Sequence, residues 1–166
     1  MLEQSPETPL QTLLNSQVRA GALVWIGLRP ARRATMITPQ RAELVEARGI
    51  TGDRYDTKRN GTRQVTLIAI EAIDAIASYL GRNAIAPELL RRNLVTSGIN
   101  LAALKGRRFR VGPALLEHSG ECAPCSQMET TFGPGGYNAV RGHGGITARI
   151  LESGEIRIGN AIIRAD

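Results

Sequence analysis

The sequence predicts a single, mainly β domain with one or two helices, in the α+β class. Its 166 residues fit one domain. The 42% apolar and 22% charged residues are typical of a globular protein with a real core. From residue 22 onward, short β-type runs alternate with turns, and only one long segment has the period of an amphipathic helix. These three observations favour a β-barrel or a sandwich completed by one or two helices.

The predicted strands are short, and turn residues separate them. Asn60-Gly61 and Gly112-Pro113 are examples, because glycine supplies a positive φ and asparagine tolerates one. The strands are expected at residues 22–28, 42–47, 63–67, 93–96, 107–111, 114–118, 147–151 and 155–163, the last broken by Gly159. So many short strands are typical of barrels.

One helix is clear over residues 67–80. Its apolar residues recur at steps of three and four, Thr66 is a candidate N-cap, and Gly81 follows as a C-terminal stop. A shorter helical turn is expected over residues 87–91, because proline is well suited to the first helical position. Residues 1–20 have a weaker helical pattern and are expected to form an N-terminal arm or a short docking helix, which leaves residues 21–166 as the domain.

Charge and composition restrict the partners. The net charge of +6 and the pI near 10.1 favour an anionic partner such as a phosphorylated cofactor. Six aromatic residues are too few for base-stacking platforms, which argues against nucleic acid. The longest apolar run, residues 21–28, is far shorter than a membrane span, and the N-terminus lacks a basic secretory start. We therefore expect a cytoplasmic protein that does not engage a membrane.

The two cysteines, Cys122 and Cys125, are the most informative residues. A disulfide that closes a loop with two intervening residues would stabilise the fold only slightly. The thiols are therefore expected to be reduced and reactive. A thioredoxin-like dithiol has this spacing, but it begins a long helix inside a βαβ unit, and neither is predicted here. Two unreactive buried thiols are a further alternative, although a loop with proline, glycine and charged neighbours is an unusual place for them.

Zinc is another alternative for this loop. A tetrahedral site would need Cys122, Cys125, His118 and His143 together, because the sequence holds no other cysteine or histidine. A single Cys-x-x-Cys is only half of the usual zinc signature. We therefore expect no zinc, and a zinc-stabilised RNA-binding barrel ranks as a lower alternative.

Several motifs together resemble one known family, the MOSC domain, named after the C-terminal part of molybdenum cofactor sulfurase. The resemblance runs in order from about residue 21 to the end of the chain. Its motifs are GITGDR (49–54), RQVT (63–66), RRNLVTSGIN (91–100), GRRFRVG (106–112), CAPC (122–125), GHGGITARI (142–150) and GEIRIG (154–159). It implies a MOSC-type β-barrel over residues 21–166, molybdopterin bound in a positively charged cleft, and a cysteine that ligates molybdenum or handles sulfur.

The resemblance also suggests roles for individual residues. Cys125 stands at the family's Pro-Cys position and is the expected molybdenum ligand or sulfur carrier, with Cys122 either a resolving thiol or a spare one. The residues expected to bind the molybdenum cofactor are Arg63, Arg92, Asn93, Arg141, His143 and Gly144. The cations expected to stabilise a thiolate are Arg110, Arg141, His143 and Arg149.

Members of this size are similar to small oxidoreductases that reduce N-hydroxylated compounds. The implied partners are a small-molecule substrate and a separate redox protein, because 166 residues leave no room for a second redox domain. Persulfide transfer, or a non-catalytic module that only holds molybdopterin, is the alternative that the same residues allow.

Overall fold

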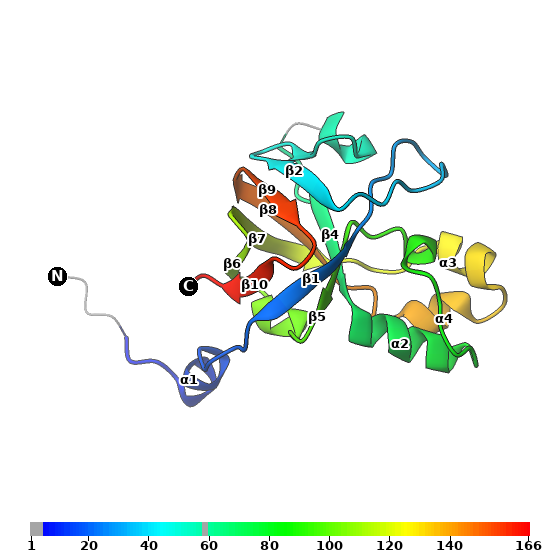
Figure 1. Ribbon diagram of the computed structural model, residues 1–166. Coiled ribbons are helices and arrows are strands. Elements are labelled where there is room, and N and C mark those ends of the chain that lie inside the picture. The colour runs from blue at the N-terminus through cyan, green and yellow to red at the C-terminus, as the bar shows by residue number, and fades with distance from the viewer. Residues whose placement is uncertain (1–4, 58–59) are drawn as a thin grey trace.

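A closed seven-stranded barrel forms the body of the chain, of which the computed structural model describes residues 5–57 and 60–166 (Figure 1). The strands, in order around the barrel, are β1 (Gly21–Ile26), β10 (Ala161–Arg164), β6 (Arg108–Val111), β7 (Ala114–Glu121), β8 (Ile146–Glu152), β4 (Val65–Ala69) and β5 (Leu94–Ser97). Strand β5 pairs with β1 and closes the barrel. The β-rich barrel expected from the sequence is confirmed.

Strands β4 and β5 form the parallel pair of the barrel, whereas the other neighbours are antiparallel. A parallel pair needs a crossover connection, and here it consists of helix α2 (Ile70–Tyr79) followed by the 3₁₀ turn η2 (Pro87–Leu90). The turn confirms the short helical segment expected after Pro87. The crossover brings the end of β4 and the start of α2 next to the end of β5.

A small sheet covers one end of the barrel. It consists of β3 (Gly49–Ile50), β2 (Arg41–Val45) and β9 (Gly154–Arg157), and it lies at the top of Figure 1. Leu44 and Ile156 of this sheet belong to the same apolar cluster as Leu67 and Phe109 of the barrel wall. The small sheet therefore closes the barrel core. The 3₁₀ turn η1 (Arg54–Thr57) follows β3.

A second apolar cluster lies outside the barrel, beneath the helices. Strand β4 serves both clusters, because Leu67 faces the barrel interior and Ile68 faces the helices. Helices α2, α3 (Ser126–Phe132) and α4 (Gly136–Val140) gather on this side of the barrel in Figure 1. Met128 and Phe132 of α3 are buried in this outer cluster. The loop that carries both cysteines (residues 122–125, the thiol loop) leads directly into α3 of this layer.

The prediction of a helix over residues 67–80 is wrong at its N-terminal end. Residues 67–69 continue strand β4, and the helix begins at Ile70 with Ala69 as an N-cap that makes no side-chain hydrogen bond. An apolar run that is buried on both faces fits both the two-residue period of a strand and the 3.6-residue period of a helix. Periodicity therefore cannot distinguish a strand from a helix there. The Thr66 hydroxyl donates to Asn93 Oδ1 at 3.1 Å instead of capping the helix.

The N-terminal arm contains helix α1 (Pro9–Leu14), which lies away from the helical layer and close to the C-terminus in Figure 1. Thr8 and Gln11 form a capping box at its start. Arg164 Nη2 donates to the Asn15 carbonyl oxygen at 2.9 Å and fixes the arm to β10. In the described part of the chain, no helix combines the length and apolar character that crossing a bilayer requires.

Candidate functional site

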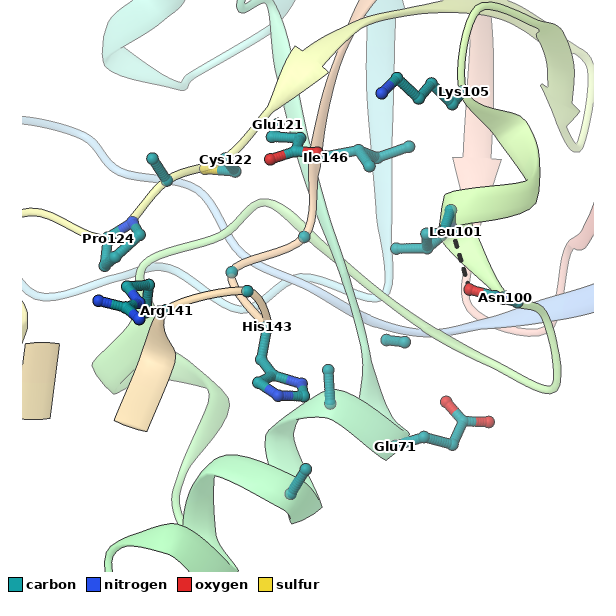
Figure 2. Close-up of a pocket in the computed structure, with 18 of the residues that line it drawn as sticks. Glu71, Asn100, Leu101, Lys105, Glu121, Cys122, Pro124, Arg141, His143 and Ile146 are labelled. Carbon is teal, nitrogen blue, oxygen red and sulfur yellow. Dashed lines mark hydrogen bonds between the residues drawn. The ribbon is translucent and has the colours of Figure 1, made fainter. Parts of the chain in front are cut away.

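A pocket of about 790 Å³ opens between the helical layer and one end of the barrel (Figure 2). Its walls come from the start of α2, the segment from β5 into the 3₁₀ turn η3 (Leu101–Leu104), the end of β7, and the loop between α4 and β8. Ala72 and Ala75 line the α2 side, whereas Ile73 and Ile76 of the same helix are buried in the outer cluster. The small alanine side chains leave the space that the pocket occupies.

Ionisable side chains of both signs line the pocket. Glu71 accepts a hydrogen bond from the Gly98 amide at 2.7 Å, and His118 Nδ1 accepts one from the Gly106 amide at 3.2 Å. Burial lowers the pKa of His118, and the neighbouring positive charge of Lys105 lowers it further. His118 is therefore neutral at pH 7 and presents its Nε2 proton.

Cys122 forms part of the pocket wall and is 4% exposed. Its amide donates to the Gly145 carbonyl at 2.9 Å, and its Sγ lies 3.9 Å from Nη2 of Arg63. Cys122 thus lies between the pocket on one side and an arginine on the other.

Arg92 is buried, 8% exposed, and it holds the thiol loop from behind. Its Nη1 donates to the Leu90 carbonyl at 2.7 Å, its Nε to the Gly144 carbonyl at 2.8 Å, and its Nη2 to the Cys122 carbonyl at 3.4 Å. Burial lowers the pKa of this guanidinium. Within residues 5–57 and 60–166, no carboxylate forms an ion pair with it.

A buried polar network adjoins Arg92. Asp53 is 3% exposed, and Arg29 binds it through Nε at 3.1 Å and Nη2 at 3.0 Å, while Asn93 Nδ2 donates to Asp53 Oδ1 at 3.1 Å. Burial raises the pKa of Asp53, but the hydrogen bonds and charge of Arg29 outweigh this effect and hold the pKa below its usual value. Asp53 is therefore ionised at neutral pH.

We use the term arginine cluster for five guanidinium groups around this network: Arg29, Arg54, Arg63, Arg91 and Arg92. Arg92 interacts electrostatically with Arg29 and Arg63, and Arg91 interacts with Arg29 and Arg54. Asp53 acts electrostatically on two of these groups, Arg29 and Arg91. Several positive charges so close together favour an anionic ligand.

The structure divides the predicted site residues into two groups. Arg141, His143 and Gly144 line the pocket together with Cys122. Arg63 and Arg92 belong to the arginine cluster, on the other side of Cys122. Gly144 is required for packing, because a Cβ there would overlap the Cys122 carbonyl oxygen.

Cys125 is exposed and occupies the N-cap position of α3, outside the residues that line the pocket. Asn93 is fully buried, and its amide is engaged by Gly27, Asp53 and Thr66. Asn93 therefore holds Asp53 and Arg29 in place through hydrogen bonds.

Two cations expected beside the thiols are engaged elsewhere. Arg110 pairs with Glu152 at 3.0 Å and Arg149 pairs with Glu117 at 2.8 Å on the barrel wall. No group of three or more His, Cys, Asp or Glu side chains among the described residues is arranged to hold a metal ion.

The sequence analysis assigned no role to Arg29 or Arg91, and it included Asp53 only as a member of the GITGDR motif. The sequence did carry a signal for Asp53, because this acid stands next to Arg54 in the GITGDR motif. Arg29 carried no such signal, since its partner Asp53 is 24 positions away.

The fold is that of a mixed β-barrel with a short thiol-bearing loop and a small helical layer. The family model of the MOSC domain matches residues 28–163. The chain belongs to the MOSC domain family, and the resemblance noted in its motifs is confirmed.

Solved structures share this fold. The YuaD protein from Bacillus subtilis is 21% identical with a TM-score of 0.75, and the match covers 88% of this chain and 96% of that one. YiiM from Escherichia coli is 18% identical with a TM-score of 0.65, covering 87% of this chain and 70% of that one. YiiM from Geobacillus stearothermophilus is 16% identical with a TM-score of 0.66, covering 88% and 75%. No curated protein matches the sequence significantly.

Proposed function

We propose that this MOSC protein binds the molybdenum cofactor and acts as a small cytoplasmic oxidoreductase, with the Cys125 thiolate as molybdenum ligand. Its substrates are N-hydroxylated small molecules, and a separate redox protein supplies the electrons. The observation that carries the proposal is the arginine cluster beside the two thiols. Both thiols act electrostatically on the buried Arg92 guanidinium.

The residues present fit such a cofactor. Molybdopterin carries a phosphate, and the arginine cluster offers such an anion several guanidinium groups, of which that of Arg29 is paired with Asp53. A thiolate is a soft ligand of the kind that molybdenum accepts, and Cys125 is exposed where Cys122 is buried. The arginines therefore match the phosphate of the cofactor, and the accessible thiol matches its molybdenum.

Each residue of the cluster has a distinct task in this proposal. Arg63 is exposed and near the Cys122 thiol, so it is the natural contact for the anion. Asp53 and Asn93 orient Arg29, and Arg92 fixes the loop that carries both cysteines. When bound, the molybdenum centre supplies two-electron redox chemistry. The chain contributes binding, orientation and the thiol ligand.

Persulfide transfer is the second candidate. It is favoured by the exposure of Cys125 at the N-cap of α3, because a carrier thiol must be accessible to both a donor and an acceptor. In it, Cys125 takes the outer sulfur of a donor persulfide, which leaves as a thiolate, and passes that sulfur to the thiolate of an acceptor. In this variant of the proposal no metal is retained.

Elemental analysis of protein made in a host that synthesises molybdopterin separates the two candidates. The oxidoreductase proposal expects molybdenum at a substantial fraction of one atom per chain, and expects Arg63→Ser to lose most of it. Arg157→Ser is the matched control, because Arg157 is an exposed arginine paired with Glu155 on the small sheet. Wild-type protein without molybdenum, but with sulfur releasable by a reducing thiol, would favour the sulfur carrier.

A further inference from the structure

We propose that the pocket of Figure 2 is a separate binding site for small zwitterionic molecules with an apolar body, such as an amino acid with an apolar side chain. This inference goes beyond the proposed function and does not depend on it. Three features carry it: the separation of the pocket from the arginine cluster, its apolar floor, and its unpaired charges of both signs.

The pocket and the arginine cluster are lined by different residues. Arg92 of the cluster does not line the pocket, but it donates to the carbonyls of Gly144 and Cys122, two residues that do. The Cys122 amide in turn donates to Gly145 at 2.9 Å, so the two pocket segments are bonded to each other. Arg29, Arg63 and Arg91 do not line the pocket. A ligand in the pocket and an anion at the cluster therefore occupy different places.

The floor of the pocket is apolar. On the α2 side it consists of Ala69, Ala72 and Ala75, and opposite them lie Leu101 and Ile146. Because larger side chains would fill this space, the alanines preserve a volume that is ample for a molecule the size of an amino acid. Burial of an apolar body on this floor contributes the non-directional part of binding.

Three charged side chains at the pocket, those of Glu121, Arg141 and Lys105, have no hydrogen-bond or ion-pair partner among the described residues, although Glu121 and Lys105 both act electrostatically on His118. The carboxylate of Glu71, in contrast, is bound by the Gly98 amide. Glu121 repels a ligand that carries only negative charge, and Arg141 and Lys105 repel one that carries only positive charge. A zwitterion offers each charge a partner.

Figure 2 indicates the orientation of the ligand. Glu121 lies next to Cys122 and Ile146, and Arg141 lies toward Pro124 at the left of the picture. An ammonium group at Glu121 and a carboxylate at Arg141 place the polar end of the ligand at this side. The apolar body then extends toward Leu101, which lies at the opposite side.

Calorimetric titration of the full chain with L-phenylalanine, phenylacetate and phenethylamine tests the inference. We expect L-phenylalanine to bind, and each probe with a single charge to bind about tenfold more weakly, because one charge-assisted contact is lost. Phenylacetate or phenethylamine binding as tightly as L-phenylalanine would overturn the zwitterion assignment. Absence of binding by all three probes would overturn the site.

Variants locate the binding. Ala75→Leu fills the pocket and is expected to abolish L-phenylalanine binding, and Ala72→Leu serves the same purpose if Ala75→Leu does not fold. Glu121→Gln is expected to weaken binding about tenfold. Asp74→Asn, an exposed neighbour on α2 outside the pocket, is the control.

Arg63→Ser is expected to leave L-phenylalanine binding unchanged. Loss of ligand binding in the pocket and loss of cofactor binding at the arginine cluster are therefore distinguishable. Unaltered binding in both alanine variants would contradict the proposal.

Discussion

Arg92 Nε donates a hydrogen bond to the carbonyl oxygen of Gly144 at 2.8 Å, which joins the start of β5 to the glycine loop before β8. The same guanidinium reaches Cys122, so one buried cation ties together three segments that are distant in sequence. This arrangement holds the thiol loop in place and leaves a positive charge behind both cysteines.

The first prediction concerns this cation. Arg92→Lys keeps the charge, but a single ammonium on a flexible stem cannot reproduce the three bonds of the guanidinium. We expect the free energy of unfolding to fall by about 1–3 kcal/mol. Urea unfolding measures the change, with exposed Arg41→Lys as the control. If the Arg92→Lys protein is as stable as the control, the hydrogen bonds of Arg92 do not hold these three segments together.

The second prediction compares two neighbouring glycines. Gly144→Ala drives a Cβ into the Cys122 carbonyl oxygen, whereas a Cβ at Gly142 meets nothing within 4 Å and suffers only from its φ of +81°. We expect Gly142→Ala to cost about 1–2 kcal/mol of unfolding free energy from backbone strain. Gly144→Ala should cost more and should also expose the Cys122 thiol. Thermal unfolding together with thiol titration checks both effects, and equal losses in the two variants would argue against the close contact.

The third prediction is a pH dependence. The pKa of Asp53 is lowered in the folded state, so its contribution to stability is present above the unfolded value of about 3.9 and is lost as the pH falls through the folded value. Asp53→Asn should lose roughly 3 kcal/mol at pH 6, because Arg29 is left without its partner.

The difference in unfolding free energy between the wild type and Asp53→Asn should therefore become smaller when the pH is lowered from 6 toward 3. Urea unfolding at several pH values measures this difference directly. A difference that stays constant over this range would show that the pKa of Asp53 is the same in the folded and the unfolded protein, which contradicts the prediction.

The fourth prediction concerns the two thiols. Cys125 is exposed and Cys122 is 4% exposed, so a disulfide reagent should modify Cys125 first in the native protein. In Cys125→Ser, the remaining thiol should react more slowly than the remaining thiol of Cys122→Ser, by on the order of tenfold or more. Both variants should react alike in urea. Faster native reaction at Cys122 would mean that the pocket delivers reagents to it.

The barrel was predictable because its strands are marked by turn glycines and short β-type runs, as at Gly112-Pro113 between β6 and β7. The start of α2 was not predictable, since residues 67–70 are all apolar and successive residues of β4 are buried on opposite faces, Leu67 in the barrel core and Ile68 in the outer cluster. Helices α3 and α4, with 7 and 5 residues, are too short to carry a periodic signal. They depend on packing of Phe132 and Val140 in the outer cluster.

The candidate site was predictable only in part. The resemblance of the motifs identified Arg63 and Arg92 as candidate site residues. It did not predict that Arg92 is buried, because arginine side chains are usually exposed. The pairing of Arg29 with Asp53 depends on tertiary contacts over 24 positions of sequence. The separation of Arg141 and His143 from the arginine cluster likewise appears only when the loops are assembled around Cys122.

The most direct test of the proposed function is the molybdenum content of Cys125→Ser and Cys122→Ser, made alongside the wild type in a host that synthesises molybdopterin. Serine is nearly isosteric but carries a hard hydroxyl that stays neutral at pH 7, so Cys125→Ser should fold and lose both molybdenum and reductase activity. Cys122→Ser should keep a substantial part of both if it is a spare thiol, and should stall after one oxidation event if it resolves a disulfide. A Cys125→Ser protein with full molybdenum and full activity would contradict the assignment.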